Sequence, residues 1–216
     1  YTGGIIGSTF KVCKVDLSSF TEVGTVTQPV TDNFQNLRAA VADDNFIYYG
    51  GSNLPGNMAH FYKLDLSSFA FSAPITTTQT LATYSQSGSI NVNQNIIVWG
   101  VETRVNDSRV RKFTVLPFAQ THYTLLEILG GEIQSSAISA DGVWGYFAGT
   151  SSAIRKVALV DTEYEGLPVL AMTQVAVLYP AASWFMGMVL DEANNKLYLI
   201  DANTPARLVR INLDYF

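Results

Sequence analysis

The stretch YKLDLSSF, residues 62–69, recurs along the chain at a nearly constant spacing. It is almost unchanged at residues 13–20, CKVDLSSF, where Lys14 precedes Lys63 by about 49 residues. More distant copies are RKFTVLPF at 111–118, RKVALVDT at 155–162 and VRINLDYF at 209–216. A period of about 45 to 50 residues is typical of solenoids, propellers and arrays. The chain is therefore expected to consist of repeated units.

Each unit can be divided into four short strands. The second strand is the clearest, because large apolar residues run into a glycine or a small polar turn. Its copies are YTGG at 1–4, FIYYGG at 46–51, IIVWG at 96–100, WGYFAGT at 144–150 and KLYLID at 196–201. Asp and Asn occupy the turns between first and second strands, as in ADDN at 42–45 and ADG at 140–142. These residues accept positive φ and hydrogen-bond their own backbone, as tight hairpins require.

The fold expected is all-β, a β-propeller of four-stranded antiparallel blades. About three blades are complete and two are partial, in one domain or part of one covering residues 1–216. The repeats lie near 1–29, 30–79, 80–130, 131–177 and 178–216. The first repeat lacks its first strand and the last lacks its fourth. We expect the open ends to be covered by further blades of the same polypeptide or by another chain.

Composition excludes several classes of protein. Hydrophobic residues make up 48% and charged residues 14%, which argues against disorder, and the net charge of −5 argues against a nucleic-acid partner. Cys13 is the only cysteine, so no internal disulfide exists; it is a buried strand residue or an intermolecular bridge. Residues 167–190 lack Asp, Glu, Lys and Arg, but Pro168 and Pro180 interrupt them, so strands are expected there and not a membrane span.

The segment DEANNKLYLIDANTPARLVRINLD, residues 191–214, resembles a repeat of the YVTN/NHL/YWTD group of propellers. The unit KVDLSSFTEVGTVT, residues 14–27, resembles propeller-like repeats in large surface proteins of unicellular eukaryotes. The resemblance implies a propeller fold and says little about activity, because propellers host many functions. LYLID at 197–201 replaces the YWTD pattern, so receptor-type ligand binding is not implied.

No catalytic residue, metal ligand or cofactor is predicted. His60 and His122 are the only histidines and do not form a pair at metal-ligand spacing. Asp43, Asp44 and Asn45 form the best oxygen cluster for calcium, but they lack the spacing of a calcium loop. Turn chemistry is the preferred interpretation of these acidic residues.

A few residues are candidates for binding. Arg38 is either an anion contact at the mouth of an axial channel, or a member of an ion pair or a solvated channel residue. Phe34, Tyr84 and Trp184 are either glycan-binding aromatics or packing between blades. Asn106-Asp-Ser108 is an acceptor sequence for N-glycosylation on an expected surface loop.

Three functional hypotheses remain. The preferred one is a non-enzymatic, extracellular or cell-surface propeller that serves as a structural or adhesion module of a larger surface protein or filament. Its partners are other protein chains or further blades, and possible glycans. The alternatives are a propeller enzyme acting on a sugar or lactone with an axial metal, and a glycan-binding propeller. In each case Phe20, Phe69 and Phe118 are expected just after the third strand, packed between neighbouring blades.

Overall fold

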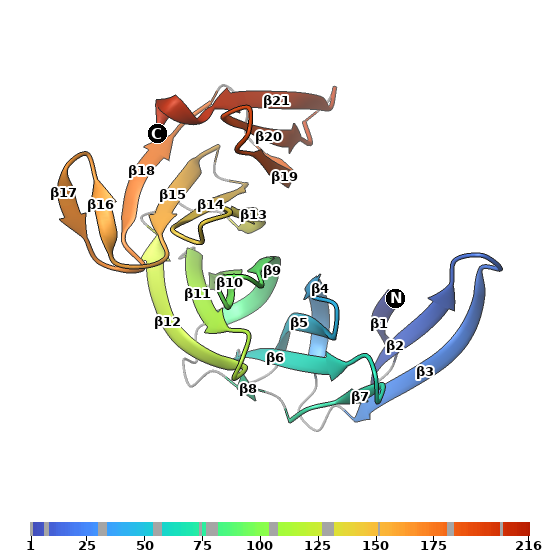
Figure 1. The fold of residues 1–216 in the computed structure, drawn as a ribbon. Coiled ribbons are helices and arrows are strands. Elements are labelled where there is room, and N and C mark those ends of the chain that lie inside the picture. The colour runs from blue at the N-terminus through green and yellow to red at the C-terminus, as the bar shows by residue number, and fades with distance from the viewer. Residues whose placement is uncertain are drawn as a thin grey trace. The chain divides into compact units, whose positions relative to one another are not determined.

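The computed structural model describes most of the chain (Figure 1). The described residues are 2–6, 9–29, 34–53, 58–73, 75–76, 82–103, 108–126, 132–150, 152–180, 184–203 and 205–216. They form β-strands, joined by turns, with one short 3₁₀ helix and no α-helix within these ranges. The strand pairs whose register the structure describes are antiparallel, and the all-β class expected from the sequence is confirmed.

The chain divides into two compact units, Tyr1–Ser85 and Gln86–Phe216. The first unit holds two sheets, which we name the β1–β3 sheet and the β4–β8 sheet. Their strands are β1 (Thr2–Ile6), β2 (Thr9–Asp16), β3 (Thr21–Pro29), β4 (Phe34–Ala42), β5 (Phe46–Asn53), β6 (Met58–Asp65), β7 (Ala70–Phe71) and β8 (Ile75–Thr76).

An aromatic cluster joins the two sheets of the first unit. Phe10 of β2 is fully buried, and its ring centroid lies 5.1 Å from that of Tyr49 and 5.2 Å from that of Phe71. Aromatic pairs at such distances add about 0.5–1.5 kcal/mol beyond the apolar area they bury. The two sheets are therefore held face to face by large rings on alternate strand positions.

The second unit contains three further sheets, and most of β9 belongs to it. We name them the β9–β12 sheet, the β13–β18 sheet (β13, β14, β15 and β18) and the β19–β21 sheet; β16 and β17 form a separate hairpin. The strands are β9 (Ala82–Asn91), β10 (Ile96–Thr103), β11 (Ser108–Thr114), β12 (Ala119–Leu126), β13 (Ile133–Ile138), β14 (Trp144–Gly149), β15 (Ile154–Ala158), β16 (Thr162–Tyr164), β17 (Leu167–Val169), β18 (Gln174–Leu178), β19 (Phe185–Asp191), β20 (Lys196–Asp201) and β21 (Arg207–Asn212). The 3₁₀ helix η1 (Leu213–Tyr215) follows β21.

The β13–β18 sheet is covered on both faces within this unit. Phe147 and Val157 pack against Val98 and Val110 of the β9–β12 sheet. On the other face, Ile154 packs with residues of the β19–β21 sheet, among them Leu197, Leu199 and Ile211. Alternation of side chains along a strand puts these two apolar sets on opposite faces. Both faces of this sheet thus contribute to the core.

One backbone hydrogen bond recurs in four sheets. It ties the turn between the first two strands to the residue just after the third strand. The donor and acceptor pairs are Leu66 N to Asn45 O, Val115 N to Asn95 O, Leu159 N to Val143 O and Leu213 N to Asn195 O. Asn95 and Asn195 adopt positive φ, of 56° and 55°, which Asn tolerates better than most residues.

The DLSS turns are closed by their aspartates. Asp16 accepts hydrogen bonds from Ser18 N at 2.7 Å and from the Ser18 hydroxyl, and Asp65 accepts the same pair from Ser67. Hydrogen bonds from the Ser67 hydroxyl and then from Ser68 N lower the pKa of Asp65 to about 2. The expected turn chemistry of these residues is therefore present.

The repeated phenylalanines do lie just after the third strand, but they do not share one environment. Phe20 is 82% exposed, so the expectation that it packs between sheets is wrong. Phe69 packs against the Phe10 cluster and lies near Gly24 of β3, and Phe118 stacks on Phe113 with centroids 5.6 Å apart.

The apolar segment 167–190 forms strands β17 and β18 and all of β19 except Asp191, with no description of residues 181–183. Among the described residues, no helix is long and apolar enough to cross a membrane. This agrees with the strands expected for that segment.

Candidate functional site

The outward face of the β19–β21 sheet is an apolar surface that the described part of the second unit leaves open. Figure 1 shows this sheet at one end of the unit, next to β13–β15. Val189, Ile200 and Leu208 are 64%, 52% and 68% exposed. Ile200 pairs directly with Leu208, and Val189 pairs with Tyr198 two residues away, so the four side chains share one face.

The corresponding face of the β13–β18 sheet is covered. The pair Ala148–Ile154 takes the place of Ile200–Leu208, and Tyr146 takes the place of Tyr198. Ala148, Ile154 and Tyr146 are 1%, 0% and 4% exposed because the β19–β21 sheet packs over them. An apolar face that is buried in one sheet is thus exposed in the next.

The same sheet also has an open strand edge. Its order is β19-β20-β21, so within the described residues β21 pairs only with β20. In the two other sheets of the unit, the corresponding strands pair with a fourth strand, β11 with β12 and β15 with β18. Edge strands present unpaired N–H and C=O groups that can pair with another chain.

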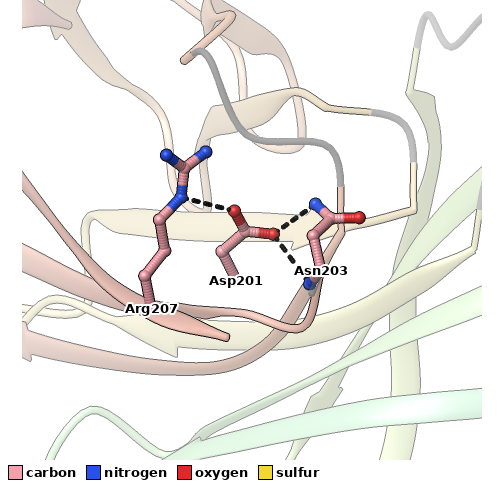
Figure 2. Close-up of polar contacts among 3 residues, drawn as sticks. All are labelled: Asp201, Asn203 and Arg207. Carbon is pink, nitrogen blue, oxygen red and sulfur yellow. Dashed lines mark hydrogen bonds and ion pairs between the residues drawn. The ribbon is translucent and has the colours of Figure 1, made fainter. Parts of the chain in front are cut away.

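A polar cluster closes the loop between β20 and β21 (Figure 2). The Asp201 side chain is fully buried and accepts hydrogen bonds from Arg207 Nε at 2.8 Å and from the backbone N–H of Asn203 at 3.2 Å. The Asn203 side-chain amide donates to the same carboxylate. Burial alone would raise the pKa of Asp201, but the hydrogen bonds from Arg207 and Asn203 outweigh it, and the pKa is lowered. Because its oxygens are satisfied by these donors, Asp201 fixes the loop.

A hollow of about 370 Å³ lies between the β9–β12 and β13–β18 sheets. Its walls include Ile96, Lys112, Thr114, His122, Asp141 and Val160. Lys112 is only 9% exposed, and its Nζ donates to the carbonyl oxygen of Leu159. Burial lowers the pKa of Lys112, and the charge of Asp161 partly opposes this shift. The hollow therefore combines apolar walls with a desolvated cation.

The residues predicted for binding are only partly described. Trp184 is 40% exposed, and its Nε1 donates to Gln134 Oε1 at 2.6 Å, which ties β13 to the segment before β19. Phe34 and Arg38 belong to β4 and Tyr84 belongs to β9, but their side chains lie outside the described part of the chain. Asn106 also lies outside the described residues, whereas Ser108 of the acceptor sequence begins β11 and is buried.

The carboxylate of Asp43 accepts hydrogen bonds from residues close to it in sequence. Asp43 Oδ1 accepts from the backbone N–H groups of Asn45 and Phe46, and Oδ2 accepts from the Tyr48 hydroxyl at 3.0 Å. Within the described ranges, no group of three or more His, Cys, Asp and Glu side chains is placed to hold a metal ion. The hydrogen bonds to Asp43 close the hairpin turn between β4 and β5.

No family model matches the chain, and no curated protein matches it either. The open face of the β19–β21 sheet and the hollow at Lys112 are the two features from which a function can be inferred. The residue pattern alone predicted neither feature. A signal for the first is present in the sequence, because aligning KLYLID at 196–201 with WGYFAG at 144–149 places Ile200 at the position of Ala148. In the same way, Ile96 stands where the neighbouring copies have an aromatic residue.

Proposed function

We propose that the chain is a non-enzymatic structural module, a β-propeller of four-stranded blades that binds other protein chains. Extracellular or cell-surface placement, as part of a larger surface protein or filament, belongs to the same proposal. The repeated motif around Lys63 supports the propeller architecture, and so does the recurring hydrogen bond that ends at Leu66, Val115, Leu159 and Leu213.

One observation carries the binding role. Ile200 and Leu208 are exposed on the face whose counterparts, Ala148 and Ile154, are covered by another sheet. Full burial of one aliphatic side chain is worth about 1.5–3 kcal/mol, so part of this energy is still to be gained at each exposed residue. A sheet face of this composition favours a second sheet as its partner.

The partner that fits is a β-sheet of the same construction, from another chain or from further blades of the same polypeptide. Within the second unit, Leu197, Leu199 and Ile211 are the side chains that cover Ile154. A partner sheet with aliphatic residues at these positions would cover Ile200 and Leu208 in the same way. In a sample of the purified chain, the available partner is the same open face of a second copy, because its Leu197, Leu199 and Ile211 are already buried.

Molecular mass in solution tests the proposal. We expect the 216-residue chain to exceed its monomer mass of 23.6 kDa in light scattering as its concentration rises. The double variant I200T/L208S should remain monomeric while circular dichroism shows an unchanged fold. Leu170→Ser is the matched control, because Leu170 is 74% exposed outside this sheet, and it should associate like the unaltered chain. A chain that stays monomeric at every concentration, or a control that dissociates as the double variant does, overturns the proposal.

A further inference from the structure

Three lysines occupy the same position on the third strands of three sheets. Each pairs directly with a residue of the neighbouring second strand, in the pairs Tyr48–Lys63, Val98–Lys112 and Tyr146–Lys156. Two residues before these partners, on the same second strands, stand Phe46, Ile96 and Trp144. Side chains two residues apart on a strand share a face, so each of these residues lies on the lysine's side of its sheet.

Two of the three lysines are covered by aromatic rings. Lys63 Nζ lies 3.5 Å from the centroid of the Phe46 ring. Lys156 Nζ lies 4.5 Å from the centroid of Trp144 and 5.0 Å from that of Tyr164. The negative face of an aromatic ring attracts a cation at these distances, most strongly where water is excluded. The rings thus replace part of the hydration that these ammonium groups lose.

Lys112 has no such ring among the described residues, because Ile96 stands in the aromatic position. Lys112 Nζ donates one hydrogen bond, to Leu159 O, and it forms no ion pair within the described part of the chain. The hollow of about 370 Å³ lies beside it, with Ile96 and Val160 among its walls. This volume is at the lower end of the range for small-molecule sites, which is about 300–1,000 Å³.

We propose that the hollow beside Lys112 binds an aromatic ring supplied by a ligand. The ring would lie over Lys112 and against Ile96, where Phe46 and Trp144 lie in the other two sheets. His122 and Asp141 line the same hollow and offer polar groups to a phenol hydroxyl, an indole N–H or the amides of a peptide. The ligand class is thus a tyrosine, tryptophan or phenylalanine side chain of a partner, or a small aromatic molecule.

Methyl NMR of the full 216-residue chain tests this site. Titration with N-acetyl-tyrosinamide or N-acetyl-tryptophanamide should produce saturable ring-current shifts of the Ile96 and Val160 methyl groups. N-acetyl-leucinamide, which lacks a ring, should leave these signals in place. Equal shifts with the leucine compound would overturn the proposal, because the site would then select only for apolar bulk.

Two variants separate the contributions of charge and space. Lys112→Met keeps the length of the side chain without its charge, and it should weaken binding of the aromatic amides about tenfold. Lys63→Met is the matched control and should leave binding unchanged. Ile96→Phe should fill the hollow with the chain's own ring, abolish binding and raise the melting temperature. If Ile96→Phe does not fold, Lys112→Met decides alone, and unchanged affinity in that variant would overturn the role of the cation.

The source of the ring is resolved by two further probes. Equal affinity for p-cresol and for a tyrosine-containing pentapeptide assigns the site to small aromatic molecules. A pentapeptide that binds at least about tenfold more tightly assigns it to a partner protein, since only the peptide reaches the polar rim. Acetate or inorganic phosphate that shifts the Lys112 signals, with no response to any aromatic probe, would make this an anion site and overturn the proposal.

Discussion

Lys63 Nζ lies 3.5 Å above the centre of the Phe46 ring, on the strand pair β5–β6. We predict a favourable coupling between these two side chains of about 0.5–2 kcal/mol. A double-mutant cycle with Phe46→Leu and Lys63→Met, measured by denaturant unfolding, gives this energy directly. A coupling indistinguishable from zero would show that the ring does not stabilise the ammonium group.

Asp65 should titrate well below an ordinary aspartate. Its pKa of about 2 lies under the usual 3.8 because the Ser67 hydroxyl and Ser68 N donate to the ionised carboxylate. Since the folded pKa is the lower one, the ionised group stabilises the fold above pH 3.8, and this contribution disappears as the pH falls toward about 2. Carboxyl ¹³C NMR measures the midpoint, and Asp65→Asn should lose less stability over this range than the unaltered chain. A midpoint near 3.8 would contradict the prediction.

Ile154 and Leu208 occupy corresponding positions but should respond very differently to truncation. Ile154 is fully buried, so Ile154→Ala should cost about 2–5 kcal/mol of the free energy of unfolding. Leu208 is 68% exposed, so Leu208→Ala should change it by less than about 0.5 kcal/mol in dilute, monomeric samples. Chemical denaturation of both variants is the measurement. Similar losses at the two sites would mean that Leu208 is covered in solution.

Arg207→Met should raise the pKa of Asp201. The variant removes a donor and a positive charge from a buried carboxylate, so burial would then dominate. In the unaltered chain the lowered pKa means that ionised Asp201 stabilises the fold above its ordinary pKa and loses this effect in acid. The variant should lose that acid sensitivity. Arg210→Met, on the same strand, is the control, and ¹³C NMR of Asp201 should show no comparable shift there.

Asn106 is predicted to carry a glycan when the chain is produced in a secretory host. The last residue of the Asn106-Asp-Ser108 acceptor, Ser108, is the first residue of β11 and is buried there, so transfer has to occur before β11 folds. Intact mass before and after glycosidase treatment detects the modification, with Asn106→Gln as the control. An unchanged mass would reject this prediction.

Much of the fold follows from short-range patterns. The alternation in FIYYGG at 46–51 and the Asp-led turns predict antiparallel hairpins, and these are present because such turns depend on neighbouring residues alone. The spacing also predicts that the first and last sheets have fewer strands, and the structure describes three strands in each.

The candidate sites follow from packing and not from local pattern. The repeat places Phe20 and Phe69 at the same turn, with positive φ of 53° and 50°, but it does not indicate which sheet face covers them. Exposure of Leu208 likewise depends on what lies over the sheet, and the hollow at Lys112 depends on the distance between two sheets. Such features arise from contacts far apart in sequence, which strand patterns alone do not specify.

The hydrogen bond shared by four sheets has a consequence for how such a chain can change over time. Its acceptors are main-chain carbonyl groups, three on asparagines and one on Val143, so the bond itself requires no particular side chain, although the positive φ of Asn95 and Asn195 favours asparagine at those two turns. Substitutions can therefore accumulate on the faces and loops while each hairpin keeps its turn geometry. A scaffold held by such bonds can therefore acquire new recognition surfaces through substitutions while the sheet beneath them keeps its structure.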